Sequence, residues 1–314
     1  MPESYLVTGG AGFIGGHLVD ALVARGAEVR VIDNFSTGKR ANIAHNLDKI
    51  TLIEGDITDL DTVHAAMDGI DYVLHQAALA SVPRSVANPL ATNHADVTGT
   101  LNVLVAARDA GVRRLVYAAS SSAYGNIEAT YKVETMPPDP RSPYAVAKLA
   151  GEYYCKAFYL TYGLETVALR YFNVFGPRQD PASQYAAVIP IFITKLLRGE
   201  APPIEGDGAQ TRDFTYIENV VQANLRACHT PDVGGEVFNV ACGGQHSILD
   251  LAHHIGRLLG TDIAPVHVAP RPGDVHDSRA DIGKARARLG YNPDIGFEAG
   301  LARTVPWYAE QADK

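Results

Sequence analysis

Residues 5–24 read YLVTGGAGFIGGHLVDALVA: an apolar run, a glycine-rich turn and an amphipathic stretch follow one another directly. We expect Tyr5–Thr8 to form a strand and Phe13–Ala24 to form a helix. The turn between them holds three regularly spaced glycines, Gly9, Gly12 and Gly15. Glycine permits a tight bend and close packing of the helix on the strand before it. A buried strand that leads directly into a helix predicts a parallel sheet covered by helices.

The alternation of strands and helices continues through the first half of the chain. Further strands are predicted at Glu28–Ile32, Thr51–Ile53, Tyr72–Leu74, Leu115–Ala118 and Thr166–Leu169. Further helices are predicted at Asp59–Met67, Asn93–Ala110 and Tyr144–Tyr162. This alternation predicts an α/β fold: a Rossmann-like, doubly wound parallel sheet with helices on both faces.

Composition excludes several classes of protein. The chain of 314 residues has a formal net charge of -8, which argues against nucleic acid or an anionic membrane as a partner. Its three cysteines form no C-x-x-C pair and its histidines show no ligand spacing, so we expect neither a disulfide framework nor a metal site. The first strand follows Met1 too closely for a signal peptide, and no apolar run is long enough to cross a bilayer. We therefore expect a soluble, cytoplasmic protein.

The glycine turn has the context of a dinucleotide-binding site. Backbone amides at such a turn approach a pyrophosphate, and the N-terminus of the following helix adds partial positive charge. Asp33 ends the second strand about 20 residues after the glycines, where a carboxylate accepts hydrogen bonds from ribose hydroxyls. Because a carboxylate there repels a 2′-phosphate, we predict NAD rather than NADP. The alternative is that Asp33 only opens a turn with Asn34 and Ser36.

The composition of the chain changes after about Asn173, where glycine and proline become frequent. We predict an NAD-binding domain over residues 1–173 and a smaller, mainly substrate-binding α/β part over residues 174–314. A helix at Asn219–Cys228 and a strand at Glu236–Val240 are expected to return to the main sheet. Segments near 214–241 would then belong with the first domain.

A tyrosine and a lysine carry the predicted chemistry. Ser142 is a good N-cap and Pro143 a good first helical residue, so a helix should begin here. Tyr144 and Lys148 then lie one turn apart on the same face. A neighbouring ammonium and the cationic nicotinamide ring favour the phenolate over the neutral phenol, which lowers the pKa of the tyrosine. Tyr-x-x-x-Lys alone is a common surface pair, but after a dinucleotide turn it indicates a hydride-transfer site.

A serine-rich segment, Ser120–Gly125 (SSSAYG), follows the predicted strand Leu115–Ala118. Ligands of such sheets bind beyond the carboxyl ends of the strands. The hydroxyls of Ser120 and Ser122 could therefore hydrogen-bond a substrate hydroxyl and relay its proton.

These motifs, in this order, resemble the extended short-chain dehydrogenase/reductase family, and within it the nucleotide-sugar 4-epimerases. The resemblance covers nearly the whole chain. It rests on TGGAGFIG from Thr8, DNFSTGKR from Asp33, HQAALASVPRS from His75, SSSAYG from Ser120, SPYAVAK from Ser142, RYFNVFGPRQDP from Arg170, GDGAQTRDF from Gly206 and RPGDVHDSRAD from Arg271.

The resemblance implies epimerisation at C4 of a UDP-hexose by an isomerase that keeps NAD bound. Tyr144 would take the proton of the 4-hydroxyl, with Ser120 or Ser122 relaying, while hydride passes from C4 to NAD and returns to the other face of a 4-keto sugar. In relatives the helices Asn93–Ala110 and Tyr144–Tyr162 form a dimer interface, so a homodimer is expected.

The resemblance implies these cofactor-binding residues: Gly9, Gly12, Phe13, Ile14, Gly15, Asp33, Asn34, Ser36, Thr37, Gly38, Asp56, Ile57, Gln76, Ala77, Ala78, Ala80, Tyr144, Lys148 and Tyr171.

The resemblance also implies a set of substrate-binding residues. Arg212 and Arg271 are candidates for the two phosphates, because a planar guanidinium suits bidentate recognition. The remaining members of the implied set are Ser81, Arg84, Ser122, Tyr144, Asn173, Ala187, Val188, Asp274 and Ser278.

The chain departs from the family pattern at two places. Dehydratases and decarboxylases of the family carry an acidic residue just before the Tyr-Gly of the serine motif, whereas this chain has Ser121 and Ser122. This difference favours an epimerase. The family usually has asparagine where this chain has Asp96, and a carboxylate there would shift the local hydrogen bonding.

Ser278 bears on the choice of sugar. It stands where glucose-restricted epimerases carry a bulky tyrosine, and a small residue leaves space for an N-acetyl group. We therefore expect activity on UDP-glucose and UDP-galactose and also on UDP-N-acetylglucosamine and UDP-N-acetylgalactosamine. The alternatives are a UDP-glucuronate 4-epimerase, with Arg84 or Arg178 meeting the carboxylate, and a nucleotide-sugar dehydratase or decarboxylase. A non-catalytic NAD-sensing protein is the remote alternative.

Overall fold

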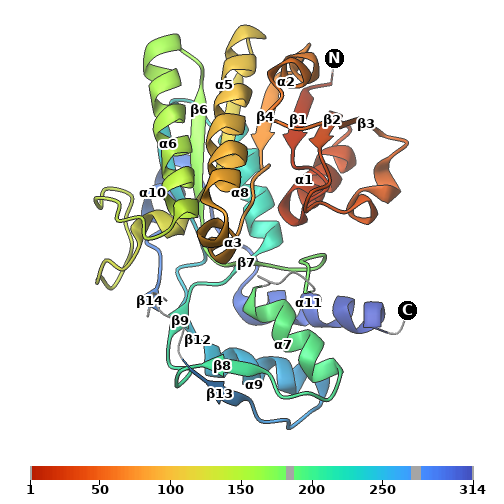
Figure 1. Cartoon of the computed structure of the whole chain (residues 1–314), viewed down its shortest axis with the longest axis vertical. Helices are drawn as coiled ribbons and strands as arrows, with labels where there is room; N and C mark the ends of the chain where they lie inside the picture. The colour runs from red at the N-terminus through yellow and green to blue at the C-terminus, as the bar shows by residue number, and fades with distance from the viewer. Residues whose placement is uncertain (1, 182–186, 270–276, 313–314) are drawn as a thin grey trace.

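Seven parallel strands form the central sheet of the protein, whose computed structural model describes residues 2–181, 187–269 and 277–312. The strands lie in the order β11-β6-β5-β4-β1-β2-β3 (Figure 1). Their bounds are β1 (Ser4–Thr8), β2 (Glu28–Asp33), β3 (Ile50–Glu54), β4 (Tyr72–His75), β5 (Arg114–Ser120), β6 (Thr166–Tyr171) and β11 (Glu236–Val240). The prediction of a Rossmann-like parallel sheet is confirmed. From β1 the chain adds β2 and β3 on one side, then crosses back and adds β4, β5, β6 and β11 on the other side.

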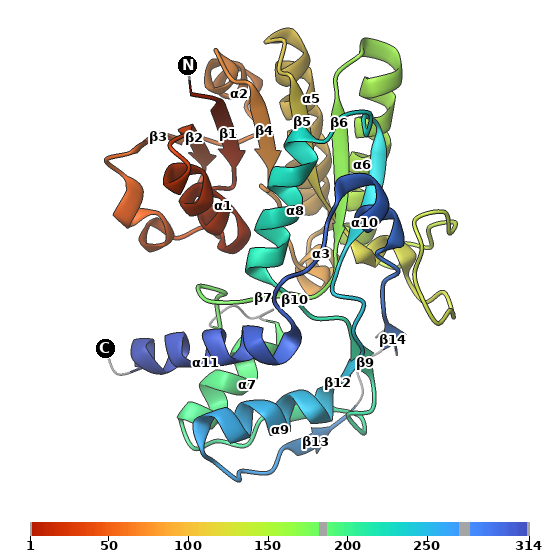
Figure 2. The same ribbon diagram turned by 180° about the vertical axis from the view of Figure 1, so that it is seen from behind.

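Helices cover both faces of the sheet (Figures 1 and 2). Helices α2 (Leu60–Met67), α5 (Gly99–Asp109) and α6 (Pro143–Tyr162) bury apolar residues against one face. On the other face, α1 (Phe13–Ala24) and α8 (Ile217–His229) pack against each other and belong to the larger core. The two clusters of buried side chains hold the carboxyl ends of the strands at one edge, where ligands of such sheets bind.

One predicted helix differs in the structure. The stretch predicted as Asn93–Ala110 consists of α4 (Pro89–Asn93), a π-helical turn (His94–Thr98) and α5. The chain enters α4 after a short helix, α3 (Val82–Ala87), and Asn88 caps α4 by accepting a hydrogen bond from the Ala91 N–H at 3.1 Å. A helical period does not distinguish an α turn from a π turn, so this feature could not be predicted from periodicity.

The second half of the chain adds a smaller part below the sheet in Figure 1. It contains α7 (Val188–Leu197), α9 (Ile248–Leu259) and α11 (Phe297–Ala312), whereas α10 (Gly283–Leu289) lies beside the sheet in contact with β11 and α8 (Figure 2). Its strands are short: β7 (Val174–Phe175), β8 (Pro203–Glu205), β9 (Thr211–Arg212), β10 (Thr215–Tyr216), β12 (His246–Ser247), β13 (Val266–Val268) and β14 (Asp277–Ser278). Single 3-10 turns occur at Arg40–Asn42, Ala44–Asn46 and Ser121–Tyr124.

The segment after residue 213 returns to the sheet. β11 pairs in parallel with β6, for example Asn239 with Arg170, and α8 packs on α1. The division at residues 173 and 174 stays a prediction. No helix in the described ranges is long and apolar enough to cross a membrane.

Candidate active site

The glycine turn after β1 is shaped for close approach of a ligand. Gly9 has a φ of 67°, and a Cβ there would lie 2.8 Å from the backbone of Ala77. A Cβ on Gly15 would lie 2.1 Å from the carbonyl oxygen of Gly9, so the start of α1 packs directly on the turn. Gly12 is the N-cap of α1 and no side chain caps the helix. Its first backbone amides therefore remain available to an anion.

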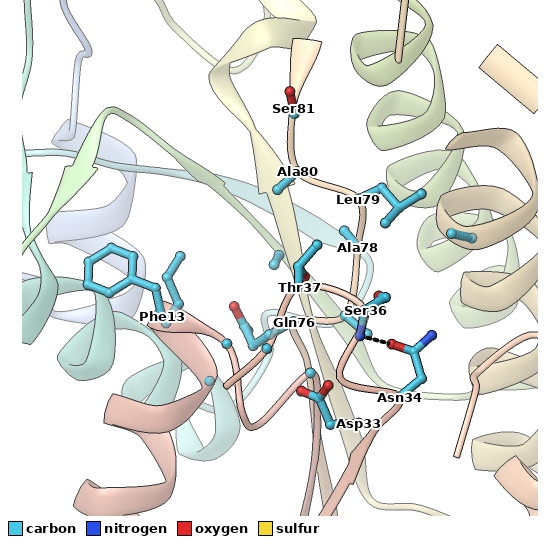
Figure 3. A pocket seen from close by; sticks show the side chains of 18 of the residues that line it. Phe13, Asp33, Asn34, Ser36, Thr37, Gln76, Ala78, Leu79, Ala80 and Ser81 are labelled. Atoms are coloured by element: carbon cyan, nitrogen blue, oxygen red, sulfur yellow. Dashed lines mark hydrogen bonds between the residues drawn. The ribbon is translucent and has the colours of Figure 1, made fainter. Parts of the chain in front are cut away.

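A cavity of about 740 Å³ opens over this turn and is called the glycine-turn cavity below. Its walls are the turn itself, the segment after β2, the end of β3, the segment after β4 and one face of α6. Figure 3 shows Phe13 at the start of α1, the segment from Gln76 to Ser81 and the Asn34–Thr37 loop around it. Every residue predicted to bind the cofactor lines this cavity.

Asp33 ends β2 in the wall of the glycine-turn cavity and is 7% exposed. Its carboxylate accepts hydrogen bonds from the Ala11 N–H at 2.9 Å and the Phe35 N–H at 2.8 Å. Burial raises the pKa of Asp33, and the two backbone hydrogen bonds oppose that shift. Each carboxylate oxygen keeps a second lone pair, so Asp33 both opens the turn and can accept a ribose hydroxyl.

Two further polar groups border the same cavity. Asn34 donates to the Asp56 carboxylate at 2.7 Å and accepts from the Ser36 N–H at 3.0 Å (Figure 3). Asp56 also accepts from the Thr58 N–H and hydroxyl, and these hydrogen bonds lower its pKa although partial burial opposes them. The glycine backbone, the uncapped helix N-terminus and the buried Asp33 together fit the pyrophosphate and ribose of a dinucleotide.

The N-terminal turns of α6 present Tyr144 and Lys148. Ser142 caps the helix by accepting from the Ala145 N–H at 3.2 Å, and Pro143 is its first residue, as predicted. The Lys148 ammonium donates to the Ala118 carbonyl oxygen at 2.9 Å, and burial lowers its pKa. Burial raises the pKa of Tyr144 to about 12, and a hydrogen bond with Ser120 opposes this.

The serine segment lies beside Tyr144 and lines a second cavity, also of about 740 Å³, called the serine-segment cavity below. Ser120 ends β5, and its hydroxyl oxygen accepts from the Ser122 hydroxyl at 2.9 Å and from the Ser122 N–H at 3.2 Å. Tyr144 lines both cavities and therefore stands where they meet. A tyrosine at this point can exchange a proton with a molecule in one cavity while that molecule faces a cofactor in the other.

The predicted substrate residues divide between the two cavities. The serine-segment cavity is lined by Ser122, Tyr144, Asn173, Arg212 and Ser278. The glycine-turn cavity is lined by Ser81, Arg84 and Ala187. Val188 is the half-buried first residue of α7 and lines neither cavity. Arg271 and Asp274 lie outside the described residues.

Arg178 has hydrogen-bond partners within the protein. Its guanidinium donates to the Asp20 carboxylate at 2.6 Å and to the Asn42 carbonyl oxygen at 2.8 Å. Arg178 and Arg84 both line the glycine-turn cavity, not the serine-segment cavity. Asp20 already pairs with Arg178, and a contact of Arg84 or Arg178 with a sugar carboxylate stays a prediction.

Sequence reasoning missed several residues of the two cavities. Lys39 and Asp180 form an ion pair of 3.0 Å at the glycine-turn cavity. Lys132 and Arg141 line the serine-segment cavity, and the buried Lys132 ammonium donates to the Ile127 carbonyl oxygen. Both come from the long connection between β5 and α6, where no periodic pattern or motif indicates which side chains turn inward.

A family model described as NAD dependent epimerase/dehydratase family matches residues 5–241. The chain belongs to this family. Its cofactor, NAD, was predicted from the glycine turn and Asp33, and the predictions of family, cofactor and an enzyme are confirmed.

Individual members of the family are similar over their whole length. The UDP-glucose 4-epimerase of Mycolicibacterium smegmatis is 40% identical over 311 residues, 98% of this chain and 99% of that protein. The structure of a UDP-N-acetylglucosamine 4-epimerase from Methanobrevibacter ruminantium, in complex with UDP-N-acetylmuramic acid, has a TM-score of 0.95 and 42% identity, covering 99% of this chain and all of that one. The structure of UDP-glucose 4-epimerase from Thermotoga maritima with UDP-glucose has a TM-score of 0.94 and 38% identity, covering 98% and 99%. The predicted enzyme class, isomerase, agrees with these names.

Proposed function

We propose that the protein epimerises C4 of a UDP-hexose through a 4-keto sugar, with NAD as a resident cofactor. The observation that carries the proposal is the position of Tyr144, which lines both cavities one helical turn before Lys148. The names of three similar relatives, which are UDP-sugar 4-epimerases, support it.

The residues of the chain divide the work of proton transfer. When bound, NAD supplies the hydride acceptor and donor for C4 and a positive ring charge that favours the Tyr144 phenolate. Tyr144 takes the proton of the 4-hydroxyl and returns it after the sugar has turned. The Ser122 hydroxyl donates to Ser120, which hydrogen-bonds Tyr144, so the two serines extend the path of the proton. The Ala118 carbonyl oxygen holds the ammonium of Lys148, one helical turn after Tyr144, in place.

The lining of the serine-segment cavity favours epimerisation over dehydration or decarboxylation. None of the described residues that line it is an aspartate or a glutamate. Elimination of water from C5 and C6 needs a positioned acid or base besides Tyr144. Ser121 and Ser122 stand just before the Tyr-Gly of the serine motif, where dehydratases and decarboxylases of the family carry an acidic residue. Neither hydroxyl is a strong acid or base.

Ser278 supports a pocket that accepts N-acetylated sugars. It lies in β14, and its carbonyl oxygen accepts from the Asp213 N–H at 2.8 Å. The backbone is thereby fixed and its small side chain lines the serine-segment cavity. Since an unfilled volume rejects a smaller ligand weakly, we propose that both the glucose and the N-acetylglucosamine series are substrates.

UDP-glucuronate is the second candidate substrate. The observation that favours it is Lys132, a buried cation in the wall of the serine-segment cavity. A carboxylate at C6 could pair with this charge. A solved relative at 32% identity is a UDP-glucuronic acid 4-epimerase from Bacillus cereus.

The experiment that tests the proposal starts with protein purified without added cofactor. It is incubated separately with UDP-glucose, UDP-N-acetylglucosamine and UDP-glucuronate, and the products are identified by proton NMR. We expect the galacto epimer of at least one substrate. A 4-keto-6-deoxy sugar or a pentose would assign the protein to the dehydratases or decarboxylases, and failure to convert any UDP-hexose would contradict the proposal.

We also propose that the protein is a homodimer. Helices α4 and α6, which contact each other, expose large apolar side chains, among them Leu90 (82% exposed), Leu160 (70%) and Tyr153 (57%). Such a patch on adjoining helices is typical of an interface with a second copy. A cytoplasmic location stays a prediction from the cysteine usage.

A further inference from the structure

Asp96 places a buried carboxylate next to the catalytic residues. It lies in the π-helical turn His94–Thr98, which packs against α6, and is 1% exposed. Its Oδ1 accepts the Leu79 N–H at 2.7 Å, which ties the turn to the wall of the glycine-turn cavity. Its Oδ2 is buried and has no hydrogen-bond partner in the protein. A carboxylate oxygen in this state is costly unless a positive charge lies close by.

Lys148 lies on α6, the helix that packs against the π-helical turn of Asp96. Burial raises the pKa of Asp96, and attraction to the Lys148 ammonium opposes that shift. Attraction to Asp96 in turn raises the pKa of Lys148 against the effect of burial. The hydrogen-bond partner of the ammonium, the Ala118 carbonyl, carries no formal charge.

The other ionisable groups around Asp96 do not compete for this role. On α6, Glu152 is held by Arg170 through hydrogen bonds of 2.9 and 2.8 Å, and burial raises the pKa of the Cys155 thiol, which keeps it neutral. On β4, burial lowers the pKa of His75 to about 3, so its ring is neutral. On β5, burial raises the pKa of Tyr117 well above its ordinary value. Within the described part of the site, none of these four groups therefore supplies a charge that pairs with Asp96 or Lys148.

We propose that Asp96 is a positioning residue of this active site, whose carboxylate is the buried counter-charge of Lys148 and sets the pH range in which Tyr144 and Lys148 work. The inference builds on the proposed function, because it concerns the same tyrosine and lysine. It adds a residue that does not touch the substrate and acts through the charge of its neighbours.

The sign of the effect follows from charge. A negative Asp96 holds the proton on Lys148 more firmly, and it also repels the negative phenolate of Tyr144, which raises the pKa of the tyrosine. Both groups then lose their protons at higher pH than they would beside a neutral side chain. Asp96 thus shifts the pH range in which Tyr144 and Lys148 work to higher pH.

The direct test is the Asp96→Asn variant of the cofactor-loaded enzyme. Asparagine keeps an oxygen for the Leu79 N–H and removes the charge. The titration of Tyr144 is followed by NMR of enzyme labelled at tyrosine Cζ, and its signal is assigned by its absence in Tyr144→Phe. We expect Tyr144 to titrate lower by about half a pH unit or more, and both limbs of the pH profile of kcat/KM to move down with it. Asp109→Asn, which removes one exposed charge at the end of α5, should leave both unchanged.

A second measurement covers the case in which Asp96→Asn folds poorly. Lys148→Met leaves Asp96 as a buried charge without a counter-charge and should lower Tm. Adding Asp96→Asn in that background should recover about half of the loss or more, because both charges are then gone. Unchanged titration of Tyr144 in Asp96→Asn, or no recovery of Tm in the double variant, would overturn the proposal. Neither readout needs turnover, so a wild-type enzyme that converts no UDP-hexose would contradict the proposed function alone.

Discussion

The Lys148 ammonium donates a hydrogen bond to the Ala118 carbonyl oxygen, 2.9 Å away, and this contact joins α6 to the carboxyl end of β5. The same strand ends in Ser120, so one strand positions both the lysine and the first serine. Tyr144 lies one turn before Lys148 and lines both cavities. β5 and α6 thus position the tyrosine, the lysine and the first serine of the active site.

Replacing Tyr144 by phenylalanine should lower kcat by about 10² to 10⁴-fold, because the proton of the sugar hydroxyl loses its acceptor. The phenyl ring fills the same space, so bound NAD should persist and can be measured by its release on denaturation. Tyr159→Phe is the matched control, since Tyr159 lies on the same helix with its ring against Gly234 and Gly235. A Tyr144→Phe enzyme with near wild-type kcat would remove Tyr144 from the mechanism.

Replacing Ser278 by tyrosine should remove activity on UDP-N-acetylglucosamine and largely keep activity on UDP-glucose. The larger ring enters the serine-segment cavity where space for the N-acetyl group is proposed. The ratio of kcat/KM for the two substrates measures the effect, with Ser278→Ala as the control of unchanged pocket volume. An equal fall for both sugars would show that residue 278 does not discriminate between them.

Acid should destabilise the fold through His75. Its ring is buried between the hydroxyls of Thr8 (2.7 Å) and Thr100 (2.9 Å), and burial lowers its pKa from 6.5 to about 3. The unfolded chain therefore binds the proton first as the pH falls, and stability that is full above about pH 6.5 is lost on the way down to about pH 3. Between pH 6.5 and 5 this histidine alone should lower the free energy of unfolding by about 2 kcal/mol.

Urea unfolding at several pH values measures this loss. His75→Gln should show a shallower decline than the wild type over the same range. His253→Gln, on the exposed face of α9, should leave the decline unchanged. Equal slopes for His75→Gln and the wild type would show that other groups carry the acid sensitivity.

A charge on the exposed apolar face of α4 and α6 should break the proposed dimer. Leu90→Asp places a carboxylate at the most exposed apolar side chain of that face and should give a monomer in light scattering after gel filtration. Leu258→Asp on α9 is the control, an exposed leucine in the second half of the chain. A wild-type monomer, or a dimer that survives Leu90→Asp, would exclude this interface.

Much of the site could be predicted because its residues lie in short motifs with local causes. The glycine turn and Asp33 follow from a strand that leads into a helix, and Tyr144 and Lys148 follow from a capped helix. The π turn around Asp96 could not be predicted, because it depends on a change of backbone hydrogen bonding that leaves the apolar pattern intact.

Contacts between segments far apart in the chain could not be predicted from the sequence either. Lys132 reaches the serine-segment cavity because its backbone pairs with Arg279 and Asp281, which are far from it in the chain. Arg178 was an expected partner for a carboxylate of the substrate, and the fold pairs it with Asp20. Neither pairing leaves a periodic signal in the sequence, so a structure was needed to find them.

In the proposed mechanism, hydride leaves C4 of the sugar for NAD that the protein retains, and it returns to C4 within the same turnover. The most direct measurement uses UDP-glucose carrying deuterium at C4, incubated with protein purified without added NAD. We expect UDP-galactose that keeps the deuterium at C4, as seen by mass spectrometry and by the missing H4 signal in NMR. Product with protium at C4, or a need for added NAD in every turnover, would contradict it.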